Sequence, residues 1–274
     1  MILVTGATGN LGALTLAALH ARKADAIGGS RTPGDAMRLL DFDDPSSVDL
    51  TGVTTVVLVS AGYAEDDQVI RRHAAVVDAA VRDGVQHIIY TSLTGAGDHL
   101  GFALAHRATE QLVTDSGLSW TILRNGLYAE LFGALMMWDG DTLESAFGAG
   151  APAVVAREDL ADVAAIVAGN PGRHAGHVYD LVGTPITADS VAAHLGTDHR
   201  TIGLAEYRRR LLGTPGLLPF QPPMLASIAT SVRHGFLGTT NTHLRDLLDH
   251  PARDASAIAA AAAAAARPEQ SRHP

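Results

Sequence analysis

The stretch MILVTGATGNLGALTLAAL, residues 1–19, decides the fold. It contains three glycines at three-residue spacing, Gly6, Gly9 and Gly12. An apolar run typical of a strand precedes them, and a segment with helical periodicity follows. Glycines in such a place allow a tight turn, close approach of the backbone to a pyrophosphate, and close packing of helix on strand. The first N–H groups of the helix, near Asn10 and Leu11, then point at the phosphate. The stretch therefore predicts a dinucleotide-binding loop.

Apolar runs and helix-like segments alternate along the chain, which is typical of a parallel sheet covered by helices on both faces. The expected strands cover residues 2–5, 25–29, 38–42, 54–60, 87–91, 120–124 and 178–182. Helices are expected over 65–83 and 103–116. The helix expected over 65–83 has an apolar stripe formed by Val69, Ala74, Val76, Val77 and Ala80. We predict an α/β protein with a Rossmann-like, doubly wound parallel sheet and a smaller C-terminal substrate region.

The pattern loosens beyond residue 126, which suggests two structural regions. We expect residues 1–125 and about 151–183 to form the dinucleotide-binding domain, and 126–150 with 184–250 to form the substrate-binding region. The segment 215–224, rich in proline and apolar residues, is expected to be irregular. Residues 255–274 are rich in alanine, and we expect them to form an exposed helix that frays into a disordered tail.

Composition narrows the function classes. The 274 residues are 47% hydrophobic, and the formal net charge is −9, which argues against general affinity for nucleic acid or anionic membranes. The chain has no cysteine, no secretory signal and no apolar run long enough to span a bilayer, so a cytoplasmic location is expected. His174 and His177 have a spacing that a metal could use, but no acid or cysteine completes the set, and we expect no metal site.

The end of the second expected strand indicates which dinucleotide is bound. NAD sites usually place an acidic residue there, whereas NADP sites place an arginine near the 2′-phosphate. Here Ser30 and Arg31 follow the strand, and no acid stands between residues 28 and 33. This favours NADP(H), because a guanidinium matches a phosphate, with NAD(H) as the alternative. Two other interpretations stay open: Arg31 as an ordinary surface residue, and Asp35 reaching the ribose.

The helix expected over 103–116 departs from the pattern of short-chain dehydrogenases, which carry Tyr-x-x-x-Lys here. In FALAHRATE, residues 102–110, Phe102 stands in the place of the tyrosine and His106 in the place of the lysine. Phenylalanine cannot protonate a nascent alkoxide, so simple ketones are poor candidate substrates. A quinone becomes a stabilised phenolate on accepting hydride, and a cationic dye becomes neutral. Orientation of the two reactants then supplies much of the rate.

Several stretches together resemble a known family. They are VTGATGNLG, GVQHIIYTSL (84–93), the H-x-x-T-E of residues 106–110, LRNGLYAE (123–130) and AREDLADVAA (156–165). In order and spacing they are similar to the atypical short-chain dehydrogenases of the NmrA-like group, especially its NADPH-dependent quinone reductases and triphenylmethane dye reductases. The resemblance covers residues 1 to about 185 and implies a reductase that binds NADP(H).

The resemblance also implies cofactor contacts. Residues Thr8, Gly9, Asn10 and Leu11 would contact the pyrophosphate, and Arg31 would contact the 2′-phosphate. Asp41 and Phe42 would lie by the adenine, with a turn beginning at Asp41 as the alternative. The ribose side would be lined by Ser60, Ala61 and Gly62.

The nicotinamide end follows from the same resemblance. Thr91 and Ser92 would end the fifth strand beside the nicotinamide, and His106 would bond to its ribose. Asn125 and Tyr128 would face the nicotinamide and the substrate. Ser92 and His106 would act in catalysis by polarising or orienting the reactants. Structural roles are the alternatives for Ser92, His106, Asn125 and Tyr128.

These inferences support one main function and two alternatives. The main hypothesis is an NADPH-dependent oxidoreductase that transfers hydride to quinone-like, dye-like or other conjugated acceptors. The alternatives are a non-catalytic redox sensor of the NmrA type and a tailoring reductase of a biosynthetic pathway. The expected partner is a small apolar or aromatic acceptor, and the expected assembly is a monomer or homodimer, with neither nucleic acid nor membrane bound directly.

Overall fold

The computed structural model describes residues 1–32, 34, 37–61 and 64–268. Its centre is a seven-stranded sheet in which every neighbouring pair is parallel. Across the sheet the strands follow the order β3 (Met37–Leu39), β2 (Ala26–Ser30), β1 (Ile2–Val4), β4 (Thr55–Val59), β5 (His87–Leu93), β6 (Ser119–Asn125) and β10 (His177–Leu181). The order reverses between β1 and β4. In open parallel sheets the crevice at such a reversal, at the carboxyl ends of the strands, is where ligands bind.

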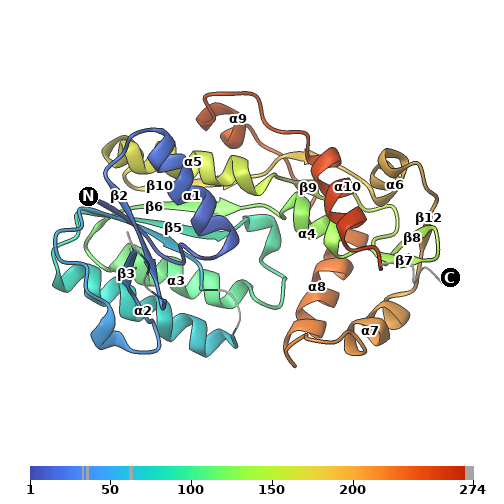
Figure 1. The fold of residues 1–274 in the computed structure, drawn as a ribbon, viewed down its shortest axis with the longest axis horizontal. Coiled ribbons are helices and arrows are strands. Elements are labelled where there is room, and N and C mark those ends of the chain that lie inside the picture. The colour runs from blue at the N-terminus through green and yellow to red at the C-terminus, as the bar shows by residue number, and fades with distance from the viewer. Residues whose placement is uncertain (33, 35–36, 62–63, 269–274) are drawn as a thin grey trace.

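Two pairs of helices cover the sheet. On one face α1 (Asn10–Ala21) packs against α5 (Arg157–Gly169), and on the other α2 (Asp66–Arg82) packs against α3 (Ala103–Asp115) (Figure 1). Successive side chains of a strand point to opposite faces, so both faces of the central strands need apolar residues. In β4, Val57 contributes to the core below α1 and α5, whereas Val56 and Leu58 contribute to the core above α2. The Rossmann-like fold is confirmed.

A smaller region lies at the carboxyl edge of the sheet, because the chain enters it after β6 and again after β10 (Figure 1). Its core includes Phe132 and Phe147, whose rings stack with centroids 4.8 Å apart. The elements are α4 (Ala129–Ala134), β7 (Met137–Asp139), β8 (Thr142–Ser145), β9 (Ala153–Val154), β11 (Thr184–Pro185), α6 (Ala188–Leu195), β12 (His199–Thr201), α7 (Leu204–Leu212), α8 (Gln221–Arg233) and α10 (Ala255–Ala265). The short α9 (His243–Leu247) packs instead on β10 and α5. Our division into two domains stays a prediction.

Two predictions for the C-terminal part are wrong. The segment 215–224 is not irregular throughout, because α8 begins at Gln221. Prolines occupy its first turn, where a backbone N–H has no helical partner to lose. The alanine-rich helix is not exposed, since α10 buries Ala255, Ala259, Ala260 and Ala263. Gly133 of α4 allows this approach, because a Cβ there would lie 2.8 Å from the Ala259 carbonyl carbon.

Candidate active site

The glycine loop lies between β1 and α1, at the reversal of strand order. Gly6 has a φ of +59°, and its carbonyl accepts a hydrogen bond from the Gly9 amide at 2.8 Å. A Cβ on Gly12 would lie 2.7 Å from the Gly6 carbonyl carbon, so only glycine permits this packing of α1 against the loop. Helix α1 begins at Asn10 after a glycine N-cap, which offers no side chain to its first N–H groups. These groups form a binding site suited to a phosphate.

Ser30, at the end of β2, joins the glycine loop to the segment that carries Arg31. Its buried hydroxyl lies 3.3 Å from the Thr8 Oγ1 and accepts a hydrogen bond from the Thr32 amide at 3.2 Å. The Ala7 amide also donates to the Gly29 carbonyl at 3.1 Å. Arg31 is exposed and directly follows this junction. Asp35, the alternative ribose contact, lies outside the described residues.

The segment after β3 is a tightly bonded turn. The strand ends at Leu39, shorter than predicted, and Asp41 accepts a hydrogen bond from the Asp43 amide at 3.0 Å. Arg72 of α2 donates two hydrogen bonds to the Asp43 carboxylate, at 2.8 and 2.6 Å, and they lower its pKa. Asp41 thus does start a turn, and Phe42 packs against the core between the sheet and α2. Their contact with adenine stays a prediction.

Side chains from three separate parts of the chain bind successive backbone amides at the end of β4. The Val59 amide donates to Thr5 Oγ1 at 2.9 Å, and the Ser60 amide donates to Thr91 Oγ1 at 3.1 Å. The Ala61 amide donates to the imidazole Nε2 of His73 at 2.9 Å. Gly62 lies outside the described residues. Thr91 therefore holds its neighbour Ser60 at the carboxyl end of the sheet.

The two residues that replace the usual tyrosine and lysine lie at the start of α3. Phe102 is the N-cap residue, and its ring centroid lies 6.2 Å from that of His106. The Nδ1 of His106 lies 2.9 Å from the hydroxyl of Tyr90 on β5. Burial, followed by the nearby charge of Arg107, lowers the pKa of His106 to about 4. The imidazole is therefore neutral at physiological pH.

Ser92 is bonded to a buried carboxylate. Its hydroxyl donates to Glu110 Oε1 at 2.6 Å, and Glu110 is only 7% exposed. The same carboxylate accepts hydrogen bonds from Arg107 at 2.7 Å and from the Nε and Nη2 of Arg124, at 2.9 and 2.6 Å. Burial acts to raise the pKa of Glu110, but the Arg124 and Ser92 hydrogen bonds and the Arg107 charge outweigh it and lower the pKa.

This network also fixes the segment that follows β5. Arg107 donates to the carbonyls of Leu93 and Thr94, at 2.9 and 3.0 Å. Asp180 of β10 accepts from the Thr94 hydroxyl at 2.9 Å and from the Gly95 amide at 2.8 Å. Five residues of these networks were not predicted from the sequence, namely His73, Tyr90, Arg107, Arg124 and Asp180. An arginine at the end of an otherwise apolar strand, in TILRN, is the signal that could have identified Arg124.

Asn125 ends β6 with an unsatisfied acceptor. The residue is 4% exposed, and among the described residues no donor bonds to its Oδ1. Buried polar atoms are rarely left without a partner, so a donor on a bound ligand is a suitable one. Tyr128, three residues further on, has the guanidinium of Arg157 over its ring at 4.9 Å. The assignment of both residues to nicotinamide and substrate stays a prediction.

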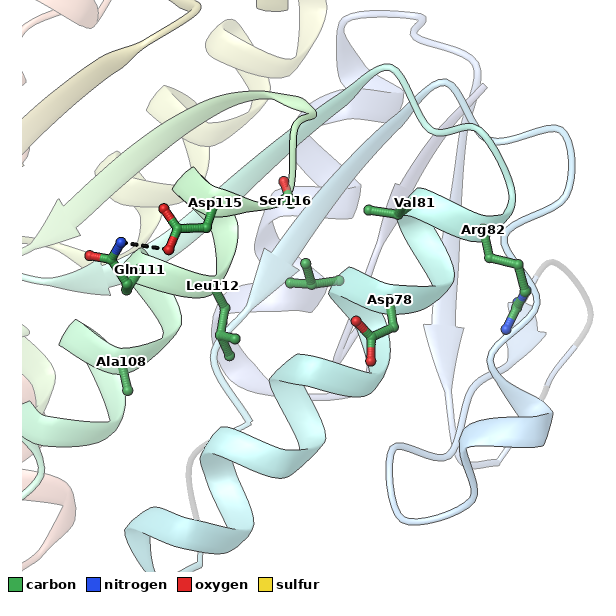
Figure 2. Close-up of a pocket in the computed structure, with 9 residues that line it drawn as sticks. Asp78, Val81, Arg82, Ala108, Gln111, Leu112, Asp115 and Ser116 are labelled. Atoms are coloured by element: carbon green, nitrogen blue, oxygen red, sulfur yellow. Dashed lines mark hydrogen bonds between the residues drawn. The ribbon is translucent and has the colours of Figure 1, made fainter.

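A groove of about 490 Å³ lies between α2 and α3, lined by Val77, Val81 and Leu112 with Asp78 and Asp115 at its rim (Figure 2). These residues belong to the later turns of both helices. Helices in such folds run antiparallel to the strands they connect, so this groove lies at the amino edge of the sheet. It is therefore remote from the crevice described above.

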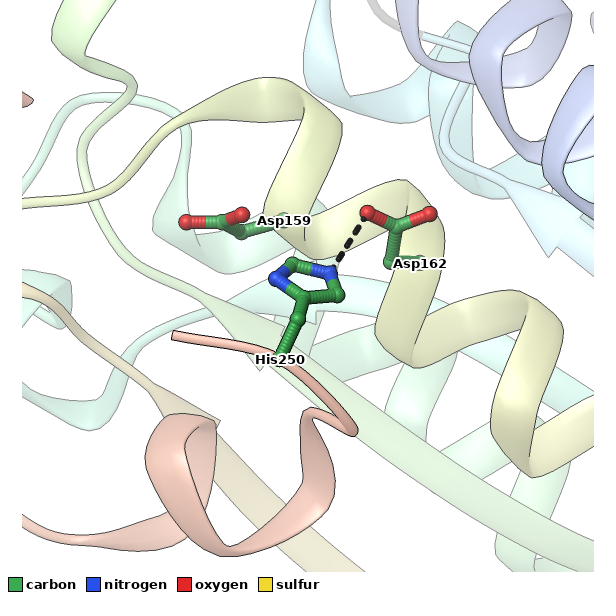
Figure 3. A group of neighbouring side chains, drawn as sticks. All are labelled: Asp159, Asp162 and His250. Carbon is green, nitrogen blue, oxygen red and sulfur yellow. Dashed lines mark hydrogen bonds and ion pairs between the residues drawn. The ribbon is translucent and has the colours of Figure 1, made fainter. Parts of the chain in front are cut away.

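Three potential metal ligands, Asp159, Asp162 and His250, lie together where the chain after α9 crosses α5 (Figure 3). Arg253 forms ion pairs with both aspartates. Its guanidinium already supplies the positive charge that the two carboxylates need. The cluster therefore attaches the C-terminal segment to α5. His174 and His177, which have a spacing that a metal could use, are not part of this cluster. The Nδ1 of His174 lies 3.0 Å from Tyr179 Oη, and the Nδ1 of His177 lies 3.0 Å from the Ala175 carbonyl oxygen.

Comparison with known proteins agrees with this geometry. A family model described as NAD(P)H-binding matches residues 6–171. Quinone oxidoreductase 2 of Escherichia coli K12 is 32% identical over 277 aligned positions, covering 92% of this chain and 94% of that protein. An NmrA-like family domain-containing oxidoreductase of Aspergillus flavus is 33% identical, over 51% of this chain and 52% of its own.

Two solved structures of reductases superpose on nearly the whole of this chain. The triphenylmethane reductase of Citrobacter sp., complexed with NADP(H), superposes with a TM-score of 0.85 at 26% identity, covering 96% of this chain and all of that one. The E. coli quinone oxidoreductase, complexed with NADPH, superposes with a TM-score of 0.84 at 30% identity, covering 95% and 99%. Among the residues that the structure describes, no helix is long and apolar enough to cross a membrane.

The glycine loop, the crevice at the strand reversal and the relatives lead to one conclusion. The expected NmrA-like and quinone-reductase resemblance is confirmed, as is the expectation of an enzyme that uses a nicotinamide cofactor. The chain belongs to the NAD(P)H-binding family and is an NAD(P)H-dependent oxidoreductase.

Proposed function

We propose that the protein is an NADPH-dependent reductase of quinones, cationic dyes and similar conjugated acceptors. The observation that carries this proposal is the start of α3, where Phe102 and a neutral His106 stand in place of a proton-donating tyrosine and its lysine. Hydride transfer to a simple ketone needs an acid at that place, whereas a quinone or a cationic dye does not. The E. coli relative is named a quinone oxidoreductase and the Citrobacter relative a triphenylmethane reductase, which supports the same acceptor classes.

In this proposal, different residues bind and orient different parts of the cofactor. The glycine loop and the first N–H groups of α1 hold the pyrophosphate, and Arg31 pairs with the 2′-phosphate. When bound, the reduced nicotinamide supplies the hydride. Asn125 offers its unsatisfied Oδ1 to a donor such as the carboxamide of that ring. If the Tyr90 hydroxyl donates to Nδ1, neutral His106 keeps its hydrogen on Nε2 and can donate to a ribose hydroxyl.

Purified protein, NADPH and a panel of acceptors test this function directly. We expect rapid loss of reduced-nicotinamide absorbance with benzoquinones, naphthoquinones and triphenylmethane dyes, and none above the blank with cyclohexanone. Equal rates with the ketone would contradict the role given to Phe102. Tight NADPH binding without turnover of any acceptor would favour the sensor alternative over the reductase.

The neutral histidine predicts a flat pH profile. With a pKa of about 4, His106 keeps one protonation state across the neutral range. We expect kcat for a cationic dye to vary less than about twofold between about pH 5.5 and 8.5, and to fall below about pH 5 as the ring gains a proton. The measurement uses saturating NADPH, because the 2′-phosphate itself titrates near pH 6 and affects KM. A step in kcat with an apparent pKa between 6 and 7 would assign a titrating group to the reaction.

Replacing Arg31 tests the cofactor preference. Arg31→Ala removes the proposed partner of the 2′-phosphate, so we expect Kd for NADPH to rise about 10- to 100-fold while Kd for NADH stays within about twofold. Fluorescence titration with both cofactors measures this. Arg173→Ala, another exposed arginine, is the control and should leave both constants unchanged. Equal loss of affinity for both cofactors in Arg31→Ala would remove the 2′-phosphate role.

A further inference from the structure

A fully buried histidine lies on α2 where the sequence predicts an apolar face. His73 is 0% exposed, whereas the neighbouring Ala74, assigned to the apolar stripe, is only partly buried. Burial of an imidazole is costly unless its nitrogens are hydrogen-bonded. Both nitrogens of His73 have partners: Nε2 accepts from the Ala61 amide at 2.9 Å, and Nδ1 lies 2.8 Å from Thr109 Oγ1.

These partners determine which nitrogen of His73 carries the hydrogen. A backbone amide can only donate, so Nε2 must be unprotonated. The Thr109 hydroxyl gives its hydrogen to the Ala105 carbonyl at 2.8 Å, so it accepts from the Nδ1–H. The ring is therefore the neutral Nδ1–H tautomer. Burial, followed by the nearness of His106 and the charge of Arg72, lowers the pKa of His73 to about 3, which agrees with this state.

His73 is one of the three side chains that bind successive amides at the end of β4. Thr5 binds the Val59 amide and Thr91 binds the Ser60 amide. Beyond Ser60 the Ala61 amide is no longer held by the neighbouring strands. Instead, this amide donates its hydrogen bond to His73, which lies on α2 and therefore outside the sheet. The Val59 carbonyl is likewise bonded to the Thr5 hydroxyl, at 3.4 Å, so side chains of the protein hold the backbone on both sides of Ser60.

We propose that His73 is a positioning residue for the cofactor, holding the backbone at Ser60 and Ala61 in the conformation that receives the ribose side of the cofactor. The proposal rests on the proposed function and on the contact of Ser60 and Ala61 with the ribose side, which the family resemblance implies. His73 itself contacts neither cofactor nor acceptor in this scheme. Its hydrogen bond to Ala61 acts through the backbone of the crevice, so its loss should weaken NADPH binding more than it slows the chemical step.

Direct titration of NADPH into three variants tests this role. His73→Leu removes both hydrogen bonds, and we expect Kd and KM for NADPH to rise about tenfold with kcat within about twofold. His73→Gln can still offer an acceptor to the Ala61 amide, and we expect it to restore Kd to within about threefold of the wild-type value. His87→Leu is the matched control, because His87 is also buried and bonds to Thr121 at the amino edge of the sheet. We expect it to lose comparable stability and keep its NADPH affinity.

A second measurement on the wild-type protein keeps the proposal testable if His73→Leu does not fold. Nitrogen-15 spectra should show the His73 ring with hydrogen on Nδ1, without titration between about pH 5 and 8, and an Ala61 amide signal that shifts on addition of NADPH. An Nε2–H tautomer, an Ala61 signal unchanged by NADPH, or equal NADPH affinity in His73→Leu and wild type would overturn the proposal. Failure of the wild type to bind NADPH would instead overturn the proposed function.

Discussion

Gly12→Ala is expected to abolish dinucleotide binding and to destabilise the fold. The new Cβ would lie 2.7 Å from the Gly6 carbonyl carbon and 3.0 Å from the Thr5 carbonyl oxygen. Both are backbone atoms, so the contact can be relieved only by moving α1 away from the loop. That movement separates the first N–H groups of the helix from the glycine turn that shapes the pyrophosphate site. We expect Kd for NADPH to rise by at least about 100-fold and the free energy of unfolding to fall by about 1–3 kcal/mol.

Gly169→Ala is the matched control for this substitution. Gly169 is the last residue of α5, and a Cβ there would meet no atom within 4 Å. The control should keep wild-type NADPH affinity and show a stability equal to or slightly above wild type, because alanine favours helix. Isothermal titration and urea unfolding of both variants give the comparison. Wild-type binding by Gly12→Ala would show that the loop does not hold the pyrophosphate.

Glu110→Gln is expected to cause the second large effect, on stability. The carboxylate accepts from Ser92, Arg107 and Arg124. The two arginines are each about three-quarters buried, with exposed fractions of 24% and 26%. Removal of the negative charge leaves the poorly hydrated Arg124 guanidinium without the ion pair that Glu110 supplies, and leaves Arg107 with Asp98 as its carboxylate partner. We expect the free energy of unfolding to fall by about 2–4 kcal/mol, measured by urea unfolding at neutral pH.

The same carboxylate predicts how stability depends on pH. The pKa of Glu110 is lower in the folded state than its usual value, so its contribution to stability is present above the unfolded-state pKa of about 4.3. That contribution is lost as the pH falls through the lower, folded-state pKa. Wild type should therefore lose more stability than Glu110→Gln on acidification from about pH 6 to 3. Glu158→Gln, at an exposed carboxylate paired with Arg253, should follow the wild-type curve, and parallel curves for Glu110→Gln and wild type would refute the assignment.

Features encoded in short stretches could be predicted from the sequence. The glycine spacing, the apolar run of β4 and the alternation of strands and helices each depend on neighbours within a few residues. The predicted strand over residues 54–60 corresponds to Thr55–Val59, and the predicted helix over 65–83 corresponds to Asp66–Arg82. The strand expected over 38–42 was too long, because Asp41 bonds to the Asp43 amide and turns the chain.

Contacts between distant residues could not be predicted in the same way. The alanine-rich segment has no polar face that would indicate which side is buried, yet one side of α10 is buried because Gly133 of α4 lets the two helices approach closely. His73 interrupts an apolar stripe, and only the position of α2 beside Ala61 and Thr109 explains its burial. Ser92 could be located at the end of β5, but not its bond to Glu110.

The sequence by itself determined the sheet, the glycine loop and the replacement of the usual tyrosine by Phe102, because these depend on residue type and local spacing. The tertiary structure alone decided the protonation state of His106, the burial of Glu110 between two arginines and the unsatisfied acceptor of Asn125. The physical reason is that hydration, charge and hydrogen bonding at these groups depend on atoms brought together from separate elements. Those atoms are neighbours only after the strands and helices have packed.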